Sequence, residues 1–215
     1  MSDVMLAAFI SAVVTLMVNI VTLVTNIFVE RFKSKSEIQR KEYQSKRERL
    51  NEVYKELIAI INLYPNSSPN DVFEHIEYAP NYSMENFDSI LKSLDYQIED
   101  YKKQLNIANI KYERKDDINI QISNREYAKK EISKIRDEYY AAKDKYKLFC
   151  ESDKVIFDLY AGQDVRNCLV EFRRIIHNVF ISGQRAGDKG DAINNILQVS
   201  RRNLVNSMRG DIGIR

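Results

Sequence analysis

Residues 4–29 form one continuous, largely apolar segment, VMLAAFISAVVTLMVNIVTLVTNIFV. A membrane span needs about 20 apolar residues, so the segment is long enough to cross a bilayer as a helix. At about 1.5 Å per residue it extends about 39 Å, against a hydrocarbon core of about 30 Å, so we expect some tilt. It is longer than the apolar region of a secretory signal, and no basic residue precedes it. We therefore expect it to remain in the mature protein.

A stripe of polar side chains follows one face of this segment. At about 100° per residue, five polar residues and one alanine fall within an arc of roughly 80°. These residues are Ala8, Ser11, Thr15, Asn19, Thr22 and Asn26. Serine and threonine can bond the preceding helical turn, but two asparagines within a span are expensive and usually face protein or water. The stripe thus indicates a packed seam between identical helices or the water-facing lining of a pore, with incidental tolerance as a third interpretation.

Basic residues follow the apolar segment directly. Arg31, Lys33 and Lys35 lie nearest to it, and we expect them to contact lipid headgroups, with an ordinary solvated helix face as the alternative. The only charged side chain of the short N-terminal tail is Asp3, so the positive-inside rule predicts that the C-terminal part lies in the cytoplasm and the N-terminus outside. Residues 31–49 contain few apolar side chains and several Glu/Lys pairs at helical spacing, which predicts a charged stalk that continues the helix.

The composition favours an all-α fold for the whole chain. Its 215 residues include only 6 glycines and 3 prolines, which leaves few places to break a helix. We expect a transmembrane helix at residues 1–30, a juxtamembrane stalk at 31–49 and a cytoplasmic, antiparallel helical bundle at 50–215.

Capping residues and apolar spacing predict where the bundle helices begin. Ser68 with Pro69 predicts a short helix, and Ser83 the start of a long one. Residues 113–122 are ambiguous between strand and loop, after which Ser123 and its capping-box partner, Glu126, predict a second long helix. Asp191 predicts the N-terminal cap of the last helix.

The composition also argues against several kinds of site. Lys and Arg number 33 and Asp and Glu 31, so the net charge of +2 gives no global attraction for nucleic acid, although local basic residues leave that question open. Cys150 and Cys168 are the only cysteines, and His75 and His177 the only histidines. We therefore expect no disulfide framework, no metal site and no cofactor. No P-loop, dinucleotide fingerprint or nucleophile elbow occurs, which indicates a protein that is not an enzyme.

One segment nevertheless resembles part of an enzyme signature. Arg166-Asn167 and the stretch from Arg173 to His177 resemble pieces of the motif of the all-helical HEPN ribonucleases, in which an arginine precedes a histidine. In this chain Glu171 stands where the histidine would follow Arg166, and the spacing from Arg173 to His177 is shorter than in the family. The resemblance implies a tethered ribonuclease with Arg173 and His177 as catalytic residues. The interpretation that we favour is a structural histidine beside surface arginines.

The order of parts resembles that of small bacterial membrane effectors. A single span, a charged stalk and a helical domain are arranged as in the accessory membrane protein of type VI CRISPR systems, a pore-forming oligomer with a degenerate HEPN-type bundle. Residues 204–213 also look like the ends of uncharacterised bacterial proteins of this size. The resemblance implies a homo-oligomer that perforates or perturbs the inner membrane in antiviral defence. The alternative is a membrane-tethered scaffold that recruits a cytoplasmic protein partner.

Overall fold

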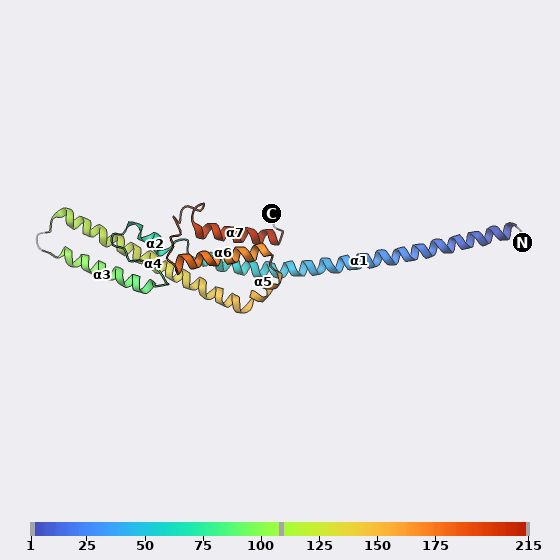
Figure 1. The fold of residues 1–215 in the computed structure, drawn as a ribbon, viewed down its shortest axis with the longest axis horizontal. Helices are drawn as coiled ribbons and strands as arrows, with labels where there is room; N and C mark the ends of the chain where they lie inside the picture. Colours follow the sequence, from blue (N-terminus) through green and yellow to red (C-terminus); the bar gives the residue numbers. More distant parts are fainter. Residues whose placement is uncertain (1–2, 108–109, 214–215) are drawn as a thin grey trace. The chain divides into compact units, whose positions relative to one another are not determined.

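In the computed structural model, the regular structure of the described residues is entirely helical (Figure 1), which confirms the all-α prediction. The structure describes residues 3–107 and 110–213, and it describes side chains for Ser11 and from Val14 onward. The helices are α1 (Asp3–Leu63), α2 (Pro69–Val72), the 3-10 helix η1 (Phe73–His75), α3 (Phe87–Leu105), α4 (Tyr112–Ser152), α5 (Lys154–Tyr160), α6 (Gln163–Phe180) and α7 (Ile196–Asp211).

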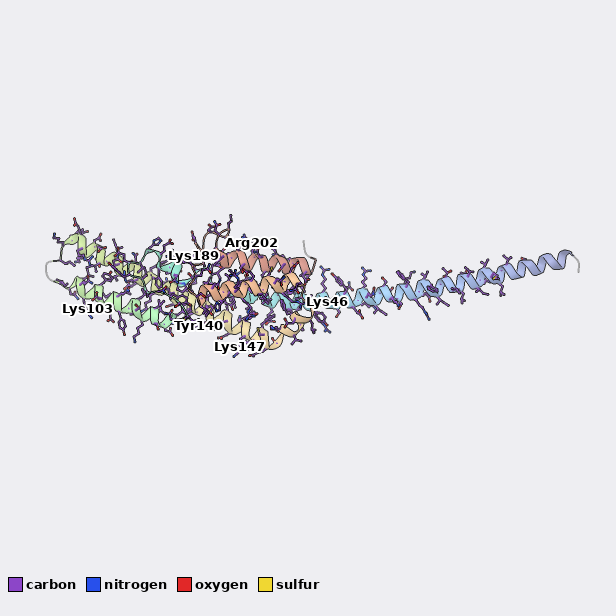
Figure 2. All side chains as sticks on the ribbon, in the orientation of Figure 1. Lys46, Lys103, Tyr140, Lys147, Lys189 and Arg202 are labelled. Carbon is purple, nitrogen blue, oxygen red and sulfur yellow. The ribbon has the colours of Figure 1, made fainter. Side chains whose placement is uncertain are left out.

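The chain divides into two units, residues 1–49 and 50–215. The first consists of the N-terminal part of α1, which is uninterrupted because no glycine or proline occurs before Pro65. Its drawn side chains project from the helix on all sides (Figure 2), and every described one is exposed. Among the described residues, α1 is the one helix long and apolar enough to cross a membrane, and none of its apolar window is buried.

The second unit has a continuous apolar core. The end of α1 contributes one face of it, with side chains at three- and four-residue spacing. These buried residues are Leu50, Val53, Tyr54, Leu57, Ile60 and Ile61, and Tyr64, directly after the helix, continues the same face. They share the core with side chains from α3 to α7, and α6 and α7 lie side by side (Figure 1).

Ion pairs join α3 to α4 along their length. Lys129 Nζ lies 2.5 Å from Asp95 Oδ1, and Arg136 Nη1 lies 2.9 Å from Asp88 Oδ1. Near the start of α3, Tyr140 (labelled in Figure 2) packs against Phe87 with ring centroids 5.8 Å apart. Because residue numbers rise along one helix as they fall along the other, α3 and α4 form a helical hairpin.

The predicted start of α4 at Ser123 is wrong. The helix begins at Tyr112 and runs through Ser123 without a break. Ile118 and Ile122 are buried in a cluster with Ile98 of α3, whereas Ile120 is 51% exposed. The three isoleucines thus follow a helical face, and packing against α3 extends the helix past its capping-box sequence.

Two other predicted helix starts are also displaced. Ser83 precedes α3 by a turn, because Met84 and Glu85 adopt positive φ angles of 54° and 57°, which a helix excludes. Asp191 closes a turn by accepting hydrogen bonds from the N–H groups of Ile193 and Asn194. The cap of α7 is Asn195, whose side chain accepts from Gln198 N–H at 3.1 Å. By contrast, the predicted start of α2 is confirmed, with Ser68 as N-cap and Pro69 in the first turn.

Candidate functional site

The polar stripe lies on the exposed surface of α1. Ser11, Thr15, Asn19, Thr22 and Asn26 are all exposed in the isolated chain. The side chain of Ala8, predicted as part of the stripe, lies outside the described residues. Helical geometry aligns the described members along one face.

The hydroxyl groups and the carboxamides of this face differ in how they are satisfied. Thr15 Oγ1 donates to Ser11 O at 2.9 Å, and Thr22 Oγ1 donates to Val18 O at 2.8 Å. In the part of the chain that the structure describes, no hydrogen bond reaches the side chains of Asn19 or Asn26. These two are seven residues apart, which places them about 10.5 Å apart along the axis and about 20° apart around it. Their unmet hydrogen-bonding capacity therefore falls on one line.

Thr25 was not predicted as part of the polar face. Its Oγ1 donates to Val21 O at 2.7 Å, as in the two threonines above. By helical angle it lies about 40° beyond Ser11, so it widens the polar face to roughly 120°. In the sequence, Thr25 stands out only as a further polar residue within the apolar segment.

The predicted headgroup contacts adjoin two aromatic side chains. Phe28 and Phe32 are 74% and 78% exposed, more than any other large apolar side chain described in this unit. With Arg31, Ser34 and Lys35 they line one shallow hollow on the helix. Arg31, Lys33 and Lys35 make no ion pair with the described residues. Basic residues are typical of the cytoplasmic end of a membrane span, and the two phenylalanines extend the apolar surface of the helix alongside Arg31.

Arg173 and His177 lie at a separate pocket in the second unit. They are one turn apart on α6, both are exposed, and both line a pocket of about 190 Å³. The other lining residues are Tyr64, Tyr139, Tyr146, Phe172, Ile176 and Ile181. Arg173 and His177 are not hydrogen-bonded to each other among the described residues. The structure thus brings the two residues to one aromatic pocket.

Burial and charge set the pKa of the hydroxyl groups of two tyrosines in this pocket. Burial raises the pKa of Tyr64 to about 12, although the charge of Arg173 opposes the rise. Burial also raises the pKa of Tyr146, again against the charge of Arg173. Both hydroxyls are therefore neutral near pH 7 and can donate hydrogen bonds.

The described side chains form no cluster of three or more His, Cys, Asp or Glu residues suited to a metal ion. Comparison with known proteins gives no match: no family model, no curated protein and no solved structure is similar to the chain. Residue chemistry and geometry are therefore the basis for the function proposed below.

Proposed function

We propose that this chain is a single-pass protein of a bacterial inner membrane that assembles with identical copies through the polar face of α1. The assembled helices perforate or perturb the membrane, and the biological role is that of an antiviral defence effector. In this proposal the short N-terminus lies outside and residues 50–215 form an antiparallel helical bundle in the cytoplasm. The observation that carries it is the pair of carboxamides at Asn19 and Asn26, which have no hydrogen-bond partner among the described residues and lie in the exposed, largely apolar segment of α1.

The exposure of α1 supports a lipid environment. Leu16, Met17 and Leu23 are each 62–63% exposed, and they belong to a long run of exposed apolar side chains. Soluble monomers rarely expose continuous apolar patches larger than a few hundred Å². A core helix of a soluble protein is buried, whereas no part of this apolar window is. Lipid supplies the missing apolar surroundings for most of the apolar segment of α1.

Lipid cannot satisfy the two asparagines. A carboxamide offers two donors and one acceptor oxygen, so it is complementary to a second carboxamide. Identical helices around a symmetry axis bring identical residues together. Hydrogen bonds between spans contribute about 0.6 kcal/mol on average and about 1–2 kcal/mol in model peptides, and the contribution repeats at every contact of a ring. Assembly thus satisfies groups that a single helix leaves free.

The test replaces both asparagines with leucine. We expect the double variant Asn19→Leu, Asn26→Leu to be monomeric in detergent by native mass spectrometry and to cause no dye leakage from vesicles. The matched control is Thr15→Val, Thr22→Val, which removes hydroxyls already bonded to the helix itself. We expect the control to assemble and to release dye as the unchanged protein does. Circular dichroism checks that both variants remain helical.

Three outcomes contradict the proposal. The first is an unchanged protein that is monomeric in detergent. The second is assembly and leakage that persist in the leucine variant. The third is an equal loss in the threonine control, because the asparagines would then have no special part. If an unrelated span restores the cellular function of residues 50–215, the chain acts as a tethered scaffold instead.

A further inference from the structure

The pocket beside Arg173 has walls of packed rings from α4, from α6 and from the residue that follows α1. Tyr64, directly after α1, meets Phe172 of α6 edge-on, with centroids 5.6 Å apart. It also meets Tyr139 of α4 at 6.2 Å. Tyr139 in turn stacks on Phe180 at 4.5 Å. The pocket is therefore bounded by the ordered core of the second unit.

The mouth of the pocket carries a positive charge without an anion. Arg174 pairs with Glu171 through two hydrogen bonds of 2.8 and 2.6 Å. Its neighbour Arg173 makes no ion pair with any described residue, and its guanidinium carbon lies 5.6 Å from the centre of the Tyr146 ring. His177 follows one turn later, and its imidazole has no hydrogen bond within the described residues. An anion bound here would meet two side chains that have no competing anionic partner among the described residues.

No acidic residue opposes such an anion at the pocket. None of the described residues that line it is Asp or Glu. The nearby carboxylate of Glu85 is already engaged, because Oε1 accepts from the Tyr139 hydroxyl at 2.5 Å and from Lys143 Nζ at 2.6 Å. The hydroxyl of Tyr64, by contrast, remains a neutral donor.

We propose that this pocket binds a small aromatic carboxylate, with its ring among the tyrosines and Phe172 and its carboxylate on Arg173. The guanidinium fork matches a carboxylate in two parallel hydrogen bonds, and His177 supplies a further donor. The size supports one ring: an apolar cavity of about 150 Å³ holds benzene, and this pocket has about 190 Å³. The inference does not depend on assembly of α1.

The test is a titration of the full-length protein in detergent with benzoate, followed by saturation-transfer NMR. We expect saturable binding of benzoate and at least tenfold weaker binding of benzamide, its neutral isostere, with no binding of inorganic phosphate. Loss of a hydrogen-bonded charge should weaken benzoate binding by about 10- to 100-fold in Arg173→Gln. Arg174→Gln is the matched control, because it alters the adjacent arginine that is already paired, and it should bind benzoate normally.

Several results would overturn the assignment. Absence of benzoate binding refutes the site, and equal binding of benzamide refutes the requirement for an anion. Equal weakening in the Arg173 and Arg174 variants shows an effect away from the pocket, and phosphate that competes with benzoate shows a general anion site. Near-UV circular dichroism of the tyrosines checks the fold of Arg173→Gln. Should that variant unfold, Arg173→Lys and the benzamide comparison on the unchanged protein still decide the question.

Discussion

Arg125 of α4 is a buried cation held entirely by neutral groups, and its removal should destabilise the second unit strongly. The side chain is 1% exposed. It donates to Gln97 Oε1 at 2.8 Å, to Gln121 Oε1 at 2.6 Å and to Glu77 O at 2.6 Å, and its guanidinium carbon lies 4.6 Å from the ring centre of Tyr101. It therefore links α3, α4 and the segment before α3.

The size of the effect follows from the acceptors left behind by Arg125→Ala. A buried acceptor without a donor costs about 1–3 kcal/mol, and three acceptors lose their donor here: Gln121 Oε1 in a buried bond, and Gln97 Oε1 and Glu77 O in part-buried ones. Water entering the space left by the side chain recovers part of this cost, so we expect a loss of about 3–5 kcal/mol. At about 2–4 °C per kcal/mol for a domain of this size, the melting temperature should fall by about 6–20 °C.

The assay is thermal unfolding of the full-length protein in detergent, monitored by the near-UV signal of the tyrosines. Arg136→Ala is the control, because Arg136 lies on the same helix but pairs with Asp88 and Asp137 at the surface. Exposed pairs contribute about 0–1 kcal/mol, so its melting temperature should fall by less than about 4 °C. Equal shifts in the two variants, or no shift for Arg125→Ala, would contradict this prediction.

Three further predictions concern separate parts of the chain. Burial raises the pKa of Glu85, but hydrogen bonds from Lys143 and Tyr139 outweigh burial and hold the pKa below its usual 4.5. The ionised Glu85 carboxylate therefore stabilises the fold above pH 4.5, and this stabilisation is lost as the pH falls. Melting curves between pH 7 and pH 3 should show a steeper loss for the unchanged protein than for Glu85→Gln, and parallel losses would contradict this. Tyr54→Phe removes a 2.5 Å hydrogen bond to Asp211 Oδ2. Because a bond to a charged group contributes about 1.5–3 kcal/mol, the melting temperature should fall by about 3–12 °C. An unchanged melting temperature would count against this link between α1 and α7. In a chain without its two native cysteines, Asn19→Cys should give a disulfide-linked dimer on oxidation, whereas Met17→Cys on the far face should not; cross-linking at both positions would argue against a defined seam.

The sequence predicted helices best where a single apolar face decides the structure. In α3, the predicted face of Phe87, Ile90 and Leu94 is buried. The prediction of this face succeeded because apolar residues at helical spacing are the main sequence signal for a helix. The start of the same helix was placed too early, because positive φ angles at Met84 and Glu85 depend on distant partners. The N–H groups of these residues donate to the carbonyls of Ile181 and Phe180.

Other errors have the same origin in tertiary contacts. The sequence from Ser123 to Glu126 satisfies the capping-box pattern, yet the burial of Ile118 and Ile122 against Ile98 keeps the helix continuous. Asn195 caps α7 because its side chain also donates to Asn66 O at 2.8 Å, a contact across 129 residues. Local patterns do not contain such contacts.

For the candidate sites, the sequence predicted which residues belong to each site but not which groups those residues contact. The stripe on α1 follows from helical spacing alone. The difference between its hydrogen-bonded threonines and its free asparagines is visible only in the structure. Arg173 and His177 were singled out for their spacing on a helix. The aromatic walls beside them come from Tyr64 and Tyr146, which are distant in sequence, so the pocket was not foreseen.

The bonds that the threonines of α1 make to their own helix have a consequence for biogenesis. A hydroxyl that returns to the preceding turn enters hydrocarbon already satisfied, so Thr15, Thr22 and Thr25 add little to the cost of inserting a lone helix. Asn19 and Asn26 retain that cost until a second copy arrives. In the proposed membrane setting, newly made chains therefore insert singly and meet later, and the level of expression sets the moment at which they act.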